Sequence, residues 1–184
     1  MAATTITIPR LETERLILRA PALQDFEAFA DFYASERAHF VGGPLNREES
    51  WRMLAMEIGH WQLAGFGRWI VETRDGGAVA GLVGLFCPEG WPEPEIGWDL
   101  FEGHEGKGYA TEAGAAARAY AYDSLGWDTA VSLVKPANVA SARVAERLGA
   151  RLEGMFTHQR HGAMQVWRHP APAALSDGGM EAYA

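Results

Sequence analysis

The segment Glu95-Ile-Gly-Trp-Asp-Leu-Phe-Glu-Gly-His-Glu-Gly-Lys-Gly-Tyr-Ala-Thr111 carries the strongest structural signal, because strand-like alternation is followed by a glycine-rich turn and an Ala-rich helix. Its glycines let the backbone approach a ligand closely. The first helical turn presents unpaired backbone N–H groups at the positive end of the helix dipole. We therefore predict a phosphate-binding loop made of Gly106, Lys107, Gly108, Tyr109, Ala110 and Thr111.

Two widespread phosphate-binding loops do not match this segment. A P-loop needs Ser or Thr directly after its Gly-Lys pair, but Gly108 follows Lys107, so the hydroxyl that would hold magnesium is absent. A dinucleotide fingerprint has the form Gly-x-Gly-x-x-Gly, and Thr111 stands where its third glycine would be. Nucleoside triphosphates and dinucleotides are therefore disfavoured as ligands.

Three segments resemble one known family. The run Glu105-Gly-Lys-Gly-Tyr-Ala-Thr-Glu-Ala113 closely resembles the acetyl-CoA loop of the GNAT acyltransferases, and Asn138-Val-Ala-Ser-Ala-Arg-Val-Ala-Glu-Arg-Leu-Gly149 resembles their Asn-x-x-Ser element. Leu11-Glu-Thr-Glu-Arg-Leu-Ile-Leu-Arg-Ala20 is similar to the first strand of the branch that includes the RimJ/RimL-type ribosomal-protein N-acetyltransferases. The resemblance covers roughly residues 10 to 168. It implies an acetyl-CoA-dependent N-acetyltransferase.

The secondary-structure pattern agrees with an α/β (α+β) protein. We expect a single domain over residues 1–169, and a loosely ordered tail over 170–184 that is rich in Ala, Gly and Pro. The resemblance implies a mixed, twisted central sheet of about seven strands flanked by about four helices. Expected helices span 25–35, 46–63, 107–125 and 139–148, and expected strands span 13–19, 68–73, 78–86, the segment around Glu95, 129–134, 151–156 and 163–168.

Apolar side chains recur at helical spacing in the first two expected helices, so we predict that they pack in the core. Asn46, with Glu49 three residues later, is the expected N-cap of the second helix. Asp75-Gly76-Gly77 indicates a hairpin. The expected core positions are Phe26, Phe29, Phe32 and Tyr33 on the first helix and Trp51, Leu54, Ile58 and Trp61 on the second.

Acetyl transfer to an amine needs a base, because an ammonium group has no lone pair with which to attack. Along the strand, alternation places Glu95, Gly97 and Asp99 on one face and Trp98 on the other. The family often uses an acidic residue of this strand as general base, so the resemblance favours Glu95 and then Asp99. The alternative is that both are solvated or structurally paired carboxylates.

The family's usual proton donor for the departing thiolate is missing, since Ala145 stands where many members carry a tyrosine. The resemblance to Rim-type relatives makes Ser141 the replacement, and it makes Asn138 a ligand of the pantetheine amides. Each also has a structural alternative, because Ser141 falls in the first helical turn and Asn138 is a plausible N-cap.

The resemblance also implies further contacts with the two substrates. Backbone groups near Leu100 and Phe101 would pair with the pantetheine arm, with ordinary sheet pairing as the alternative. Gly103 replaces the side chain that usually contacts the pyrophosphate, which leaves His104, Lys107 or Arg143 as candidates. Trp91, in a Pro-rich loop, is a candidate substrate contact beside Glu95.

The amino-acid composition limits the classes of molecule that this protein can bind. The formal charge is −8, which disfavours nucleic acid, and one cysteine, Cys87, excludes an internal disulfide. No apolar run approaches the ~20 residues of a membrane span, and no histidines have metal-ligand spacing, so we expect neither membrane nor metal. We expect a cytoplasmic monomer or homodimer that acetylates a small-molecule amine or a protein N-terminus.

Two alternatives to an enzyme stay open at this point. Ala145 and Gly103 are compatible with a non-catalytic acyl-CoA-binding or sensor protein on the same fold. The glycines and carboxylates are also compatible with structural roles in an unrelated α/β protein.

Overall fold

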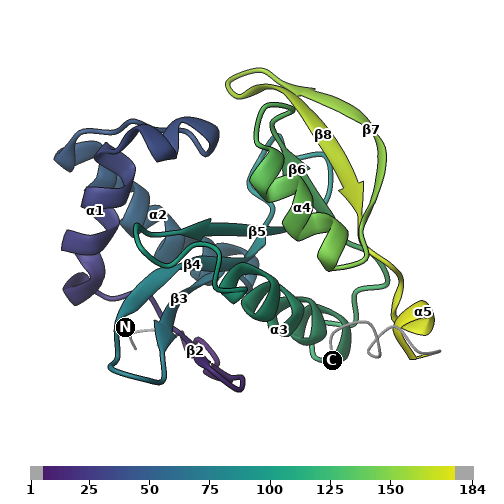
Figure 1. Cartoon of the computed structure of the whole chain (residues 1–184), viewed down its shortest axis with the longest axis horizontal. Coiled ribbons are helices and arrows are strands. Elements are labelled where there is room, and N and C mark those ends of the chain that lie inside the picture. Colours follow the sequence, from purple (N-terminus) through teal and green to yellow (C-terminus); the bar gives the residue numbers. More distant parts are fainter. Residues whose placement is uncertain (1–5, 177–184) are drawn as a thin grey trace, which may run out of the picture.

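The structure is a computed structural model, and it describes residues 6–176 (Figure 1). One eight-stranded sheet has the order β1-β2-β3-β4-β5-β6-β8-β7, and every neighbouring pair is antiparallel except β5 with β6. The strands are β1 (Leu11–Glu12), β2 (Leu16–Arg19), β3 (Arg68–Thr73), β4 (Val79–Phe86), β5 (Glu95–Leu100), β6 (Val131–Val134), β7 (Arg151–His158) and β8 (Gly162–Arg168).

The helices are interspersed among these strands, so the predicted mixed α/β fold class is confirmed. They are α1 (Phe26–Ala34), α2 (Arg47–Ala64), α3 (Tyr109–Asp123), α4 (Val139–Arg147) and α5 (Pro172–Ser176), with 3-10 turns η1 (Leu23–Asp25) and η2 (Glu36–Phe40). The predicted tail begins with α5. Residues 177–184, the rest of that tail, lie outside the described residues.

Helices cover both faces of the sheet, because successive residues of a strand point to opposite sides. On β3, Ile70 packs in a cluster with Phe29 of α1 and Leu54 of α2. Its neighbours Trp69 and Val71 pack in a second cluster that contains the alanines of α3. Figure 1 shows α3 crossing the sheet in front, with α1 and α2 on the other side.

Several local predictions are confirmed. The four aromatic residues predicted on α1 are all buried, and the two strands flanking Asp75-Gly76-Gly77 pair as an antiparallel hairpin. Asn46 caps α2, accepting from the Glu49 backbone N–H at 3.0 Å, and the Glu49 carboxylate accepts from the Asn46 N–H at 2.8 Å.

The predicted core face of α2 is wrong in part. Leu54 and Trp61 are buried, with 4% and 2% of their surface exposed, but Trp51 and Ile58 are 53% and 37% exposed. The buried face of α2 is therefore rotated away from the predicted stripe.

Polar residues take the buried positions of α2 because each finds a partner there. The Glu57 carboxylate binds the Arg68 guanidinium, with 3.2 Å between Oε2 and Nε. His60 Nδ1 lies 2.7 Å from the Phe66 carbonyl, and its Nε2 accepts from the Cys87 N–H at 3.1 Å. Polar groups that have hydrogen-bond partners can be buried without the usual cost, so hydrophobicity alone assigned the buried face of this helix wrongly in part.

Among residues 6–176, no helix is both long and apolar enough to cross a membrane.

Candidate functional site

The site lies where the sheet splits between β5 and β6. Glu95 and Val131 form the register pair that joins these parallel strands. Beyond that pair, side chains replace the backbone ladder: the Leu133 N–H donates to Glu95 Oε1 at 3.2 Å, and the Ser132 hydroxyl donates to the Ile96 carbonyl at 2.6 Å. Side chains thus hold the two strands together where the backbone pairing stops. Beyond these contacts β5 and β6 diverge, and we call the space between them the wedge.

Glu95 is buried at the start of this wedge, with 9% of its surface exposed. Burial raises the pKa of Glu95 to about 7. Hydrogen bonds from Trp91 and Leu133 and the charge of Arg68 act in the opposite direction and limit this rise. The Trp91 indole N–H donates to Oε2 at 2.6 Å. Such a carboxyl group changes its protonation state near neutral pH, where a general base is most useful.

Asp99, four residues after Glu95 and on the same face of β5, has a different environment. Its Oδ2 accepts from Arg68 Nη1 at 2.9 Å and from the Tyr33 hydroxyl at 3.1 Å. Arg68 also binds Glu57, so two buried carboxylates share one guanidinium. Burial raises the pKa of Asp99, while Arg68 and Tyr33 oppose the shift. This environment favours the structural alternative for Asp99.

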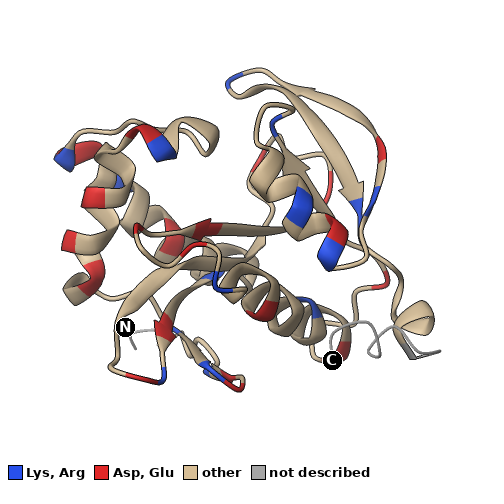
Figure 2. Ribbon diagram, viewed as in Figure 1, with Lys and Arg blue, Asp and Glu red and all other residues tan. Residues whose placement is uncertain are grey.

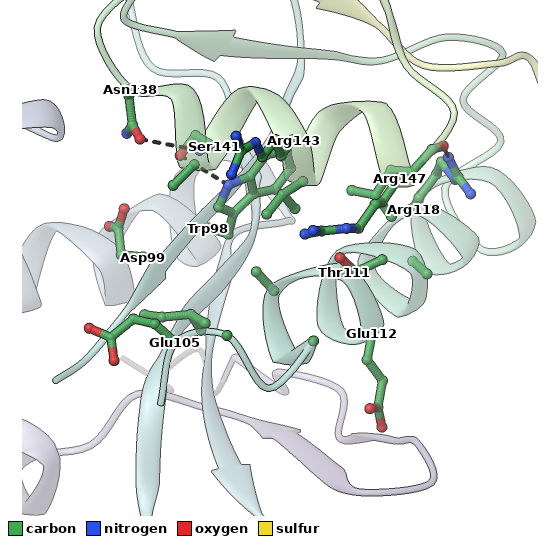
Figure 3. A pocket seen from close by; sticks show the side chains of 18 of the residues that line it. Trp98, Asp99, Glu105, Thr111, Glu112, Arg118, Asn138, Ser141, Arg143 and Arg147 are labelled. Carbon is green, nitrogen blue, oxygen red and sulfur yellow. Dashed lines mark hydrogen bonds between the residues drawn. The ribbon is translucent and has the colours of Figure 1, made fainter. Parts of the chain in front are cut away.

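A larger cavity of about 1550 Å³ follows the wedge between α3 and α4 (Figure 3). Of the predicted binding residues, Leu100, Gly106, Gly108, Ala110, Thr111, Asn138, Ser141 and Arg143 line it. The cavity therefore brings together the glycine-rich loop and the Asn-x-x-Ser element, which lie about thirty residues apart in the chain.

The glycine-rich loop has the backbone that was predicted for it. Gly106 and Gly108 have φ angles of +71° and +80°, which favour glycine. A Cβ built on Gly106 meets nothing within 4 Å, so this position faces open space. α3 then starts at Tyr109 and points its N-terminal N–H groups toward the cavity end that Gly106, Gly108 and Ala110 line.

Two arginines line the larger cavity on its α4 side. Figure 2 shows Lys and Arg along α4 and beside the start of α3. Arg143 and Arg147 of α4 line the cavity, are exposed, and form no hydrogen bond or ion pair within residues 6–176. Arg15 lines it too, but Glu112 holds its guanidinium, with 2.7 Å between Nε and Oε2. The two α4 arginines therefore remain available to an anionic ligand.

Ser141 faces this cavity from the first turn of α4 (Figure 3). The helix-start N–H is satisfied by Asn138, whose Oδ1 accepts from the Ser141 N–H at 3.2 Å. The Ser141 hydroxyl instead accepts from the Trp98 indole N–H at 3.3 Å. Asn138 is thus the N-cap, and the Ser141 hydroxyl retains its own proton for another acceptor.

A smaller cavity of about 330 Å³ lies on the other side of β5, and both Glu95 and Trp91 line it. The residues that line both cavities are Phe40, Val41, Trp98, Asp99, Asn138 and Ser141. The two cavities therefore meet beside the Ser141 hydroxyl.

Four predicted binding residues do not line the larger cavity: Phe101, His104, Lys107 and Tyr109. The Phe101 N–H donates to the Ala80 carbonyl at 2.9 Å, so it has the sheet pairing considered as the alternative. The Tyr109 ring lies under the Arg15 guanidinium, 5.1 Å from its centroid. His104 Nδ1 is buried with no hydrogen-bond partner among the described residues, and burial lowers the pKa of His104.

Sequence reasoning missed residues that the structure brings to the site. Arg147 could have been found, because it follows Arg143 by one helical turn on α4. Trp98 was placed on the face opposite Glu95, yet it lines both cavities because its indole ring reaches α4. No local pattern signals the Arg68 pairing, since its partners lie 11 and 31 residues away.

Comparison with known proteins gives a consistent result. The family model described as "Acetyltransferase (GNAT) domain" matches residues 15–151. The N-acetyltransferase YoaA of Bacillus subtilis is 30% identical over 152 residues, which are 80% of this chain and 86% of YoaA.

Solved structures agree with the sequence comparison. An acetyltransferase from Agrobacterium tumefaciens superposes with a TM-score of 0.82 and 38% identity, covering 92% of this chain and 98% of that one. The ribosomal L7/L12 α-N-protein acetyltransferase RimL, solved with coenzyme A, superposes with a TM-score of 0.70 at 20% identity, covering 86% of this chain and 95% of RimL. The latter similarity concerns the fold alone.

Proposed function

The chain belongs to the GNAT acetyltransferase family, and from that membership we propose that it moves the acetyl group of acetyl-CoA to a primary amine in a ternary complex. One observation carries this proposal: the larger and smaller cavities meet beside Ser141 and Trp98, and Glu95, three residues before Trp98 on β5, lines the smaller one. A thioester in one cavity and an amine in the other would meet there.

The larger cavity suits a coenzyme A thioester. The loop glycines and the first turn of α3 offer backbone N–H groups to a pyrophosphate. Arg143 and Arg147 would neutralise further phosphate charge. We propose that the phosphates lie at the loop and that the thioester end reaches Ser141.

Proton transfers at Glu95 and Ser141 accompany the proposed reaction. Glu95, directly or through water, accepts one proton from the bound ammonium group. The amine nitrogen then attacks the thioester carbonyl carbon, a C–N bond forms, the C–S bond breaks, and the nitrogen releases its second proton to solvent. Ser141 donates its hydroxyl proton to the departing sulfur and is reprotonated from solvent. Asp99 has a structural part in this scheme, holding Arg68 beneath the site.

Calorimetric titration with acetyl-CoA, 3′-dephospho-CoA and pantetheine tests this proposal. We expect saturable binding that weakens as phosphates are removed, followed by thiol release in the presence of amines or N-terminal peptides. Binding without release from any amine would favour the non-catalytic acyl-CoA binder. No binding would contradict the assignment of the loop. We propose a cytoplasmic location, where acetyl-CoA is consumed.

A further inference from the structure

We infer that the acceptor is a compact primary amine with an apolar body and a carboxylate, of the size of one amino acid, rather than the end of a protein chain. This inference rests on the proposed function and concerns the smaller cavity. Its volume of about 330 Å³ is at the lower end of the range for small-molecule sites. The residues that cover the cavity, those at its buried end, its apolar lining and its exposed edge each limit which acceptor fits.

One segment covers part of the smaller cavity. We call residues 36–43, which comprise η2 and the three residues after it, the roof segment. The Lys135 ammonium donates to the His39 carbonyl of this segment at 3.0 Å. A Cβ built on Gly42 would lie 3.5 Å from the His161 ring, so the roof segment also packs against the turn between β7 and β8. In Figure 1, this segment and that turn lean toward each other above β5.

The roof segment is fixed to its own side of the wedge as well. The Arg37 guanidinium pairs with the Glu105 carboxylate and donates to the Leu100 carbonyl at 3.1 Å. The Gly43 N–H donates to the Ala38 carbonyl at 2.8 Å. These bonds hold the roof segment in place, which leaves less room over the cavity for a protein chain than for a small amine.

The floor of the smaller cavity favours an ammonium group. Glu95 lies there without a cationic partner among the described residues. The adjoining network has two carboxylates, Glu57 and Asp99, for the one guanidinium of Arg68. The buried end of the cavity therefore has an excess of negative charge.

Most of the remaining lining of the smaller cavity is apolar. Thioether and aromatic side chains predominate, and methionine adapts its shape to apolar ligands of different outline. The wall residues are Phe40, Met53, Met56, Phe86, Trp91 and Met164. The body of the acceptor should therefore be an aliphatic, thioether or aromatic group.

The rim carries cations that can bind a carboxylate. Lys135 uses one of its three N–H donors on the roof segment, and Arg160 has no side-chain partner within residues 6–176. Glu89 also reaches the rim and offsets one of these two charges. Burial lowers the pKa of His161, which keeps that neighbour neutral. A negative floor below a positive rim matches a zwitterionic acceptor.

Matched sets of amines test this inference. Thiol release from acetyl-CoA is measured with L-phenylalanine and L-methionine, their methyl esters, the corresponding decarboxylated amines, and tetrapeptides that begin with the same residues. We expect the free amino acids to have kcat/KM values at least about tenfold above the other three groups. Esterification lowers the pKa of the neighbouring amine and so favours the ester, which means that amine basicity cannot produce this result.

A variant of the rim gives a second readout. Arg160→Gln should raise KM for the free amino acids about tenfold while leaving KM for acetyl-CoA and the rates with decarboxylated amines unchanged. Arg151→Gln is the matched control, since Arg151 is an exposed arginine of β7 that lines neither cavity. Turnover of peptides or esters at or above the rate of free amino acids would overturn the inference alone. Thiol release from no amine at all would overturn the proposed function with it.

Discussion

The indole N–H of Trp98 donates to the hydroxyl oxygen of Ser141 across 3.3 Å, from β5 to α4. A hydroxyl that accepts one hydrogen bond still has its own proton to donate, and no described residue receives it. The Ser141 O–H therefore stays free to donate at the junction of the two cavities. Trp98 is a positioning residue in this arrangement, and Ser141 is the proposed proton donor.

Ser141→Ala should lower kcat by about 100-fold, because general acid catalysis typically contributes at least that much. Trp98→Phe keeps most of the ring but lacks the N–H, so it should lower kcat by about fivefold, the value of one hydrogen bond. The double variant should be no slower than Ser141→Ala. Steady-state kinetics at saturating acetyl-CoA measures all three. Additive losses would show that Trp98 acts through packing instead.

Glu95→Gln should remove the rise of kcat with pH. Because burial places the pKa of Glu95 at about 7, the wild-type rate should increase through neutral pH as the carboxyl group ionises and then level off. A glutamine cannot accept the proton, so the variant should be slower and lack that inflection. Glu89→Gln is the control, as Glu89 is an exposed carboxylate at the rim of the same cavity. If kcat depends on pH in the same way in the wild type and in Glu95→Gln, Glu95 is not the general base.

Gly106→Ala should weaken acetyl-CoA binding with little change in folding. Gly106 and Gly126 both have a φ of +71°, and a Cβ at either position meets nothing within 4 Å. Alanine should therefore cost each about 1 kcal/mol of stability from backbone strain. Only Gly106 lines the larger cavity, so calorimetry should show a weaker Kd for Gly106→Ala and an unaltered one for Gly126→Ala. Equal affinities would place the phosphates elsewhere.

Arg68→Met should cost about 3–5 kcal/mol of unfolding free energy, because it leaves the Glu57 and Asp99 carboxylates buried without their cation. Urea unfolding measures the loss. Arg74→Met removes an exposed arginine, 3.8 Å from Glu12, and should change stability by less than about 0.5 kcal/mol. Similar losses for both variants would mean that the buried network contributes little.

His169→Gln should reduce the sensitivity of the fold to acid. Burial, with the charges of Arg118 and Arg168, lowers the pKa of His169 to about 3, so the native imidazole is neutral. The unfolded chain takes up a proton near pH 6.5, and wild-type stability therefore falls as pH decreases from about 6.5 toward 3. This one residue accounts for about 3 kcal/mol at pH 4.5.

The variant loses the contact between the His169 Nε2 and the Ser132 hydroxyl, so the informative quantity is the slope of unfolding free energy against pH. We expect a shallower slope between pH 6.5 and 4.5 than in the wild type. An unchanged slope would mean that His169 is protonated in the folded protein.

Much of the fold followed from the sequence because its signals are local. The glycine-rich loop, the Asn46 cap and the hairpin at Asp75-Gly76-Gly77 each depend on residues within a few positions of one another. The resemblance to GNAT acetyltransferases depended on three short segments, and the match of the family model to residues 15–151 confirms it.

What the sequence did not predict depends on partners that are distant in the chain. The buried face of α2 could not be assigned by hydrophobicity, because Glu57 is buried only through Arg68 on β3. Trp98 was assigned to the face away from Glu95 by strand alternation, which describes where a Cβ points and not how far an indole extends. The catalytic roles proposed for Glu95 and Ser141 remain predictions until they are measured.

One side chain that joins β5 to β6 at the split is also the proposed catalytic base. Glu95 is the proposed proton acceptor, and it also accepts a hydrogen bond from the Leu133 N–H, which has no backbone partner on β5. The reactive carboxylate therefore cannot move without changing the shape of the wedge. The turn between β7 and β8 lines only the smaller of the two cavities and does not join β5 to β6. An engineer who seeks a new acceptor should therefore change this turn and keep the strand pair intact, since recognition by the turn is separable from reactivity.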